Sequence, residues 1–370
     1  MKIEDVKKCS FQNWYNDFKK VTIKSIILPL PEEFVSYILK DGIVLPKNSG
    51  FGYSVPINDS DTESDDTEQT WEDNEEDEPE APEFLDFDNS IKDAIKALGG
   101  KVFPKLNWSS PRDASWIAFN NTCCCETVSD IYLLLKSSNF ITHDLTQSYI
   151  LCEDFNELEL NNSESTNQKE DFYLVLRRWT EIEPSGEFRC FVQNRALIGI
   201  SQREHSLYFD HIDHCKDAIV EDIVNFYQLH IQSKFPCDNY VFDVYRKKGK
   251  VYLIDFNPFG IVCESLLFSW NELNSGSVKP NGNNLPEFRY VNSSCGVRPS
   301  TLSHHAVPQD IIDISTGEDS FKLVDLLKLK IEAQNKEYSD DSEEEWKNGA
   351  MHGDSFGCDV EDRAGGGKQG

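Results

Sequence analysis

The sequence predicts an α+β fold in which short antiparallel strands are mixed with helices. Short runs rich in Val, Ile, Tyr and Phe recur along the chain, and the runs at 240–245 and 250–258 are joined by an Arg-Lys-Lys-Gly segment typical of a hairpin turn. Between the strand-like runs lie segments whose apolar residues recur at helical spacing. Strands paired as hairpins and mixed with helices favour the α+β class.

The helices are predicted from apolar spacing and from residues that start or stop helices. Phe11, Trp14, Tyr15 and Phe18 form one stripe of a helix that begins near Ser10. We expect this stripe to pack in the protein's core, with a partner-binding helix as the alternative. The other predicted helices are 31–39 with proline in its first turn, a segment through 91–98 stopped by two glycines, 129–137, a long helix through 219–227, and 320–333.

The strands are predicted where β-branched and aromatic residues cluster. Besides the two hairpin strands, they cover 22–28, 101–106, 172–179, 187–192 and 197–202. Residues 153–171 and 275–310 are polar or rich in Asn, Ser, Gly and Pro, and we expect them to be loops. No internal repeat is present.

The charge of the chain limits its partners. At 370 residues and a net charge of −29, it is a poor candidate for binding nucleic acid or an anionic membrane, and a basic surface on a protein partner fits better. We find no signal peptide and no segment of about 20 apolar residues, so we expect a soluble cytoplasmic protein. Residues 58–83 hold fourteen Asp or Glu and no Lys or Arg, which predicts a disordered acidic loop.

Metal or nucleophile chemistry based on Cys, His or Ser is not indicated. The eleven cysteines are scattered apart from Cys123–Cys125, and adjacent cysteines do not easily share one tetrahedral metal, so reduced thiols are expected. His205, His211 and His214 have no acidic or cysteine partner at ligand spacing. The sequence also contains no P-loop, dinucleotide-binding or nucleophile-elbow motif.

The hairpin at 240–258 carries the candidate metal ligands. Pairing of its strands can bring Asp243 and Asp255 side by side, and Asn257 points the same way as Asp255 because side chains alternate along a strand. Magnesium takes one or two carboxylates and completes its shell with waters and phosphates, which would suggest Mg-nucleotide binding. The alternative is an ordinary hairpin whose polar residues mark strand ends.

A nucleotide site also needs positive charge to meet the phosphates. Lys105, Arg112 and Arg189 are the candidates, although each is equally compatible with a surface position. Lys105 is the strongest of these candidates. We expect it to be more than a solvated surface residue, because Phe103, Lys105 and Asn107 share one side of a strand and the lysine is flanked by aromatic residues and proline.

Five longer strings resemble the cell division cycle protein 123 (D123) family. They are Val21-Thr-Ile-Lys-Ser25, Phe103-Pro-Lys-Leu-Asn-Trp108, Pro111-Arg-Asp-Ala114, Gly186-Glu-Phe-Arg-Cys-Phe191 and Ile254-Asp-Phe-Asn-Pro-Phe-Gly260. The resemblance runs from about residue 1 to residue 335 and includes the acidic insert. It implies an ATP-grasp fold, in which two α+β subdomains enclose ATP. It also implies a cytoplasmic, monomeric assembly chaperone that binds the gamma subunit of eukaryotic translation initiation factor 2 and promotes its joining to the alpha and beta subunits.

The resemblance also assigns roles to individual residues. Asp243, Asp255 and Asn257 correspond to Mg²⁺ ligands, and Lys105 and Arg189 correspond to phosphate contacts. The other ATP-binding positions that the resemblance implies are a nucleotide-facing loop with Trp108, Ser110 and Arg112, a hinge strand with Leu176, Arg177 and Arg178 whose backbone reads adenine, and Glu187 near the ribose. Arg178 stands where lysine is expected and Ser110 where alanine is usual.

The domain organisation follows from the resemblance and the composition. Residues 1–57 form the N-terminal part of the ATP-grasp-like domain, 58–83 the acidic loop, 84–335 the core with a C-terminal helix, and 336–370 an acidic and Gly-rich tail. Two other functions stay open. The chain is alternatively an ATP-grasp ligase that joins a carboxylate to an amine, or an acidic interaction protein without a nucleotide.

Overall fold

The α+β class is confirmed by a computed structural model. Its strands form two sheets, one antiparallel and one mixed, and helices pack on both. The structure describes residues 1–40, 46, 82–118, 121–156, 171–280 and 285–293. The predicted helix 320–333, the C-terminal tail and nearly all of the acidic loop lie outside the described residues. Within these residues, no helix combines the length and apolar character needed to cross a bilayer.

The first sheet has three strands and is antiparallel throughout. Its order is β1-β3-β2, with β1 at Ser25–Pro29, β2 at Val102–Lys105 and β3 at Tyr173–Arg178. Four helices share its apolar core, namely α3 (Glu32–Leu39), α4 (Leu85–Leu98), α5 (Val128–Lys136) and α6 (Asn139–Thr146). Because side chains alternate along β3, Leu174 and Leu176 face this core while Val175 and Arg177 face the other way.

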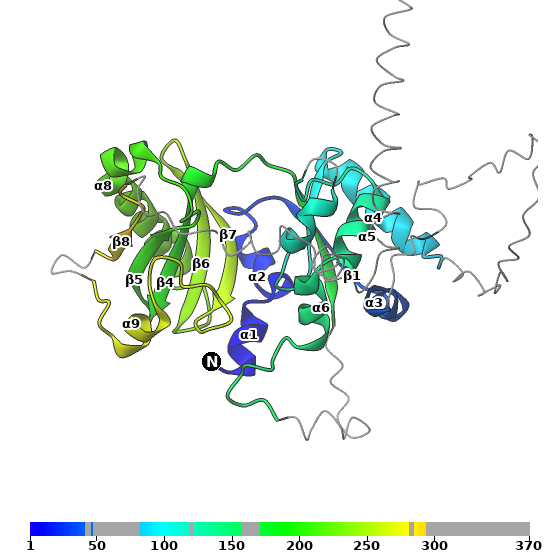
Figure 1. Ribbon diagram of the computed structural model, residues 1–370, viewed down its shortest axis with the longest axis horizontal. Coiled ribbons are helices and arrows are strands. Elements are labelled where there is room, and N and C mark those ends of the chain that lie inside the picture. Colours follow the sequence, from blue (N-terminus) through cyan, green and yellow to red (C-terminus); the bar gives the residue numbers. More distant parts are fainter. Residues whose placement is uncertain (41–45, 47–81, 119–120, 157–170, 281–284, 294–370) are drawn as a thin grey trace, which may run out of the picture. The chain divides into compact units, whose positions relative to one another are not determined.

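The second sheet has five strands in the order β7-β6-β4-β5-β8, which Figure 1 shows from one edge to the other. The strands are β4 (Glu187–Gln193), β5 (Ala196–Gln202), β6 (Tyr240–Lys247), β7 (Lys250–Pro258) and β8 (Glu287–Arg289). All neighbours are antiparallel except β5 and β8, which are parallel. The strand β7 is therefore at one edge of the sheet.

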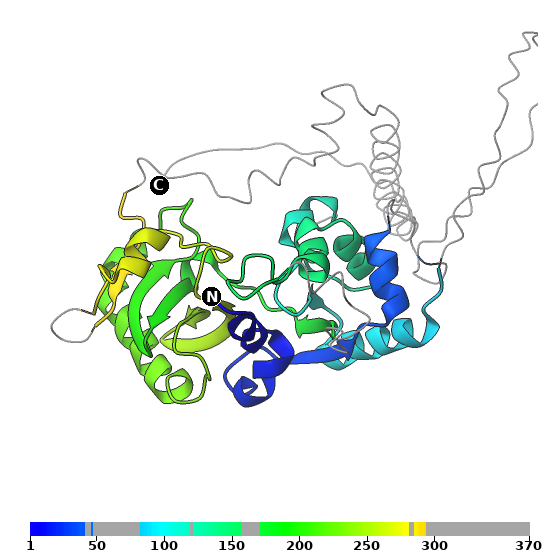
Figure 2. The same cartoon turned by 90° about the horizontal axis from the view of Figure 1, so that it is seen from below.

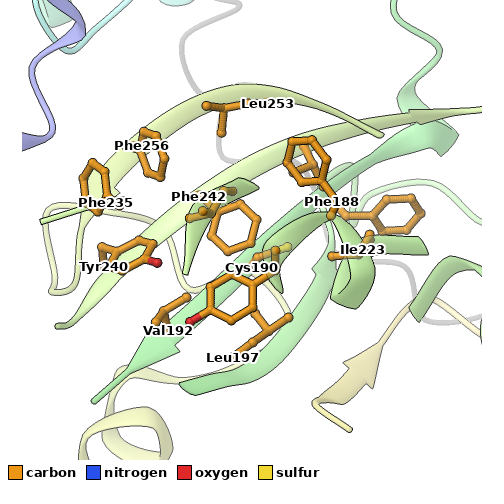
Figure 3. Packing of buried hydrophobic residues seen from close by; sticks show 14 of the residues in the cluster. Phe188, Cys190, Val192, Leu197, Ile223, Phe235, Tyr240, Phe242, Leu253 and Phe256 are labelled. Carbon is orange, nitrogen blue, oxygen red and sulfur yellow. The ribbon is translucent and has the colours of Figure 1, made fainter. Parts of the chain in front are cut away.

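Helices cover both sides of the five-stranded sheet. The long helix α8 (Asp210–Phe226), which continues into a π-helical turn at Tyr227–Ile231, packs on one side, and α9 (Trp270–Ser275) packs on the other. Figure 2 shows the sheet between these two helices. On the α8 side, aromatic rings fill the core, and Figure 3 shows Phe235, Tyr240 and Phe256 close together. The rings of Phe235 and Phe256 are stacked with centroids 3.9 Å apart.

The predicted aromatic stripe belongs to the core, so this prediction is confirmed over the partner-binding alternative. In α2 (Phe11–Phe18), Phe11, Trp14 and Phe18 are buried, and they pack with residues of β7 such as Phe256. The hydroxyl of Tyr15 donates to the main-chain oxygen of Ser25 at 3.0 Å. A short helix that the sequence did not predict, α1 (Ile3–Lys8), precedes α2.

The predicted hairpin is confirmed, and its turn is tighter than expected. The pairs continue to Lys247 and Lys250, which leaves only Lys248 and Gly249 in the turn. Both turn residues have positive φ angles of 52° and 77°. Two-residue hairpin turns require this left-handed geometry, which glycine adopts at no steric cost.

Three further elements were not predicted. Helices α6 and α9 are short, and β8 has three residues and lies within the stretch 275–310 that we expected to be loop, so that expectation is wrong for 287–289. The strand β8 forms because Glu287–Arg289 pairs in parallel with the edge of β5. This pairing is a tertiary contact that three residues of sequence do not reveal.

Candidate functional site

A row of charged residues crosses three strands of the five-stranded sheet. Arg189 on β4 pairs with Asp243 on β6, and Asp243 pairs with Asp255 on β7. Residues directly opposite one another in a sheet point to the same side. The sequence-based prediction that the two aspartates lie side by side is therefore confirmed.

A β-bulge sets the direction of Asp255. Asp243 pairs with Asp255 but the next residue, Val244, pairs with Leu253, so Ile254 is an extra residue in β7. On either side of the bulge, Leu253 and Phe256 are both buried in the core beneath the sheet. In a regular strand they would face opposite sides, because they are three positions apart. The bulge thus lets β7 bury both apolar residues while Asp255 faces the site.

Asp243 is held by two arginines. The guanidinium of Arg189 donates from Nε to Oδ1 and from Nη2 to Oδ2 of Asp243, both at 2.8 Å, and Nε of Arg203 lies 3.9 Å from Oδ2. Burial raises the pKa of the Asp243 carboxyl, but the charges of Arg189 and Arg203 outweigh burial and hold it below its ordinary value. Asp243 is therefore ionised at neutral pH.

Asp255 is paired with a lysine of the other sheet. Nζ of Lys105, at the end of β2, donates to Oδ2 of Asp255 at 2.5 Å. Lys105 is almost fully buried and its Nζ lies 5.2 Å from the centre of the Phe11 ring. Burial lowers the pKa of Lys105, an effect that the charge of Asp255 opposes and that of Arg177 reinforces. The prediction that this lysine is not a simple surface residue is confirmed.

The donors at this position fit a magnesium ion. Asn257 is partly exposed and follows Asp255 by two positions, with the buried Phe256 between them. The part of the chain that the structure describes contains no group of three or more His, Cys, Asp and Glu side chains that could hold a metal. The candidate set stays the one that the sequence predicts, two carboxylates and one amide oxygen, which are hard oxygen ligands of the type that Mg²⁺ prefers.

The predicted nucleotide-facing loop lies next to the charged row only in part. Arg112 begins a 3₁₀ helix (Arg112–Ile117), and its charge adds a smaller contribution to those of Arg189 and Arg203 in lowering the pKa of the Asp243 carboxyl. The indole N–H of Trp108 instead donates to the main-chain oxygen of Val6 at 2.9 Å. Ser110 is partly exposed, and its main-chain carbonyl accepts a hydrogen bond from the amide of Arg112.

Two aspartates, one on α6 and one in the 3₁₀ helix that follows the loop, fasten this loop to α6. Asp144 of α6 accepts from the amide and the hydroxyl of Ser109, both at 2.7 Å. Asp113 accepts from the hydroxyl of Ser138 at the start of α6. Both aspartates are buried, so the loop is fastened to α6 at two points.

The predicted hinge residues differ in what their side chains do. Leu176 is buried in the core of the three-stranded sheet, and Arg178 is exposed with its amide bonded to the carbonyl of Lys24. Arg177 is buried and reaches β7, where Nη1 donates to the carbonyl of Ile254 at 2.8 Å. Glu187 at the start of β4 is partly buried. Burial lowers the pKa of Arg177 and of Arg203, and the negative charge of Glu187 opposes this shift.

Sequence reasoning missed Arg203 and Glu264. Arg203 lies 3.4 Å from the Glu264 carboxylate, and the carbonyl of Glu264 accepts from Nη1 of Arg189 at 2.8 Å. A signal for Arg203 was present, because Ser201 pairs with Arg189 and a residue two positions further along faces the same side. Glu264 lies in a loop, where no such periodicity exists.

The arrangement brings four buried or partly buried cations to two carboxylates. Lys105, Arg177, Arg189 and Arg203 gather around Asp243 and Asp255. The four cations carry more charge than the two carboxylates balance. A metal with a polyphosphate suits the same groups, since the carboxylates meet the metal and the cations meet the phosphate oxygens.

Comparison with known proteins gives a consistent result. The D123 family model matches residues 14–315. A protein from Xenopus tropicalis named "Translation initiation factor eIF2 assembly protein" is 46% identical over 343 residues, which cover 91% of this chain and 99% of that protein. The Dictyostelium discoideum protein of the same name is 35% identical and covers 90% of this chain and 97% of its own length. The solved structure of Cdc123 from Schizosaccharomyces pombe superposes with a TM-score of 0.63 at 32% identity, covering 79% of this chain and 99% of that one.

Proposed function

Because the chain belongs to the D123 family, we propose that it assists the assembly of eukaryotic translation initiation factor 2 (eIF2). The observation that carries this proposal is the match to relatives named as eIF2 assembly proteins, which extends over almost their full length. Within this proposal, the chain acts in the cytoplasm as a monomer that binds the gamma subunit, and it is a chaperone and not an enzyme.

We further propose that Mg-ATP binds at the charged row. Asp243, Asp255 and Asn257 would hold the metal, and Lys105 and Arg189 would contact the phosphates. When bound, magnesium neutralises phosphate charge and joins the nucleotide to the carboxylates. The protein's own contribution is to keep the acids ionised and the cations close, which the lowered pKa of Asp243 and the buried position of Lys105 support.

Assembly is tested by following the three eIF2 subunits in cells depleted of this protein. We expect tagged gamma subunit to recover less alpha and beta subunit after depletion, and wild-type chain to restore recovery. A variant with Asp243→Asn and Asp255→Asn should restore it poorly, because the metal ligands are lost. Full assembly in depleted cells would contradict the proposed role.

Nucleotide binding is tested by calorimetry with ATP in the presence of Mg²⁺ and again in EDTA. We expect binding that depends on Mg²⁺ and falls at least about tenfold in Asp255→Ala, since a carboxylate ligand is removed. Asp93→Ala, an exposed acid on α4, is the matched control. Unchanged binding in Asp255→Ala would contradict the site assignment.

The same sample separates a chaperone from a ligase. Release of ADP that requires an added carboxylic acid and amine would favour the ligase. Nucleotide binding without such turnover supports the chaperone. If the protein binds no nucleotide at all, the acidic interaction protein is the function that remains.

A further inference from the structure

The side chain of Arg177 makes a contact that backbone recognition of adenine does not explain. Nη1 of Arg177 donates to the carbonyl of Ile254 at 2.8 Å, and Nη2 donates to the hydroxyl oxygen of Thr22 at 3.2 Å. Ile254 is the extra residue of the β7 bulge. The arginine thus contacts the one position of β7 where the regular pairing with β6 is interrupted.

The outer edge of β7 explains why the bulge needs such a contact. In the described part of the chain β7 is an edge strand, so no strand of that part pairs with the main-chain groups of β7 that face away from β6. Val21 and Thr22 cover part of this edge, since the amide of Leu253 donates to the carbonyl of Val21 at 2.8 Å and the hydroxyl of Thr22 donates to the carbonyl of Leu253 at 2.7 Å. Arg177 continues this cover by one residue to Ile254.

Arg177 is itself held rigidly. Its side chain is buried, its guanidinium carbon lies 5.3 Å from the centre of the Phe11 ring, and it extends from β3, the central strand of the three-stranded sheet. The main chain of Arg177 belongs to β3 and its guanidinium is hydrogen-bonded to β7, so the side chain ties the position of the bulge to that of β3. A shift of the bulge would rotate Asp255 away from Asp243 and from Asn257.

We propose that Arg177 is a positioning residue that fixes the β7 bulge through the carbonyl of Ile254 and thereby aims Asp255 into the site. The proposal rests on the proposed Mg-nucleotide function for its effect on binding. Its structural part does not depend on any ligand. Arg177 acts here through its guanidinium and through another residue, which differs from reading adenine with the main chain of its strand.

The first measurement is hydrogen exchange of the ligand-free full chain. We expect Arg177→Met to speed amide exchange in the peptide covering 252–258 by about tenfold, because a charge-assisted hydrogen bond to a main-chain oxygen is lost. Exchange in β5 should stay as in the wild type. Lys92→Met, which changes an exposed basic residue of α4, is the control and should leave both peptides unchanged.

The second measurement compares nucleotide affinity with Mg²⁺ and in EDTA. We expect Arg177→Met to weaken Mg-dependent binding about tenfold and to change binding in EDTA by less than about threefold, because a metal ligand has moved while the phosphate contacts remain. Equal losses under both conditions would mean that Arg177 contacts the nucleotide directly, which overturns the proposal.

Two further variants keep the test decisive if Arg177→Met does not fold. Arg177→Lys keeps the charge but not the forked donors, and Arg177→Gln keeps a hydrogen-bond donor without the charge; both should speed exchange of the 252–258 peptide. Wild-type exchange in that peptide, or a rise spread equally over all strands, would overturn the proposal. If the wild type binds no nucleotide, the proposed function fails, and the exchange data alone decide on Arg177.

Discussion

At the scale of single residues, the pair of Lys105 and Asp255 has the largest consequences. The lysine side chain is 2% exposed and the aspartate side chain 18% exposed, so the lysine has lost nearly all its water. A buried ammonium is stabilised only if an acid and suitable contacts replace its hydration. Asp255 is therefore needed to stabilise the buried charge of Lys105, in addition to the metal-binding role that we propose for it.

A double-mutant cycle tests this dependence. Lys105→Met should lower the free energy of unfolding by about 3 kcal/mol, because it leaves Asp255 without its partner. Adding Asp255→Asn should recover part of the loss, with a coupling energy of about 1–3 kcal/mol. Urea unfolding of the two single variants and the double variant measures the cycle, and strictly additive effects would show that the pair does not contribute as a unit.

The cysteines give a second prediction at this scale. Cys215 is exposed on α8, whereas Cys9, Cys125, Cys190 and most of the other described cysteines are buried, and burial raises the pKa of their thiols. In a background with Cys295 and Cys358 changed to Ser, Ellman's reagent should therefore modify one thiol rapidly, and Cys215→Ser should abolish that fast phase. A fast phase that persists in Cys215→Ser would show that another described thiol is accessible.

At the scale of elements, the loop before the 3₁₀ helix depends on α6. Asp144→Ala leaves the amide and the hydroxyl of Ser109 without their acceptor, which should lower the free energy of unfolding by about 2–3 kcal/mol. It should also weaken nucleotide binding, because the loop carries Arg112. His143→Ala, which changes the exposed neighbour, should alter neither property. If Asp144→Ala is destabilised but binds nucleotide normally, the loop does not contribute to the nucleotide site.

The contact between α9 and β8 gives a prediction about pH. Arg289 donates to both carboxylate oxygens of Glu272, at 2.7 and 2.9 Å, and these bonds lower the pKa of Glu272. A lowered folded-state pKa stabilises the protein above the unfolded value of about 4.3, and the stabilisation is lost as pH falls through the folded value. Glu272→Gln should cost about 0.5–1 kcal/mol at pH 7, a difference that shrinks below about pH 4.

Unfolding at several pH values measures this difference. Glu221→Gln, which changes an exposed acid of α8, provides the baseline for removing one negative charge. A Glu272→Gln effect that stays constant down to pH 3 would show that the ionised pair is not its source.

The hairpin shows which features of an element the sequence predicts and which features it does not. Strand composition and the glycine at 249 were sufficient to predict β6, β7 and the meeting of Asp243 with Asp255. The bulge at Ile254 was not predictable, because it depends on which side of β7 the core lies. Short elements such as α6 and β8 were missed for a related reason, since tertiary contacts and not local periodicity hold them.

The same distinction applies to the candidate site. Lys105, Arg189 and Asp255 stood in the family-like strings and Asp243 in the predicted hairpin, and the structure brings the four residues together. Trp108 stood in one of these strings, and the resemblance placed Leu176 in the hinge strand. In the structure, however, the indole N–H of Trp108 donates to the carbonyl of Val6, and the side chain of Leu176 is buried in the core. A string specifies identity and spacing, whereas the direction of each side chain depends on strand pairing that only the fold supplies.

At the scale of the whole molecule, the charge of −29 bears on how the protein meets a partner. Interacting charges change the rate of encounter more than the lifetime of a complex, and salt screens them over about 8–10 Å. Residues 58–83 contribute fourteen of the acidic residues and no basic ones. If the gamma subunit of eIF2 presents a basic surface, this segment should increase the association rate without being required for the final contact.

Stopped-flow or surface-based kinetics with purified gamma subunit tests this idea. We expect the association rate to fall about tenfold between low and high salt, with a dissociation rate that changes much less. Deletion of 58–83 should lower the association rate at low salt and make it less dependent on salt, because part of the negative charge that attracts a basic partner is removed. A matched variant with the acids of this segment changed to Asn and Gln keeps its length and separates charge from chain length. An association rate that is insensitive both to salt and to these variants would show that the contact forms through apolar or hydrogen-bonded surface, without electrostatic attraction from the acidic segment.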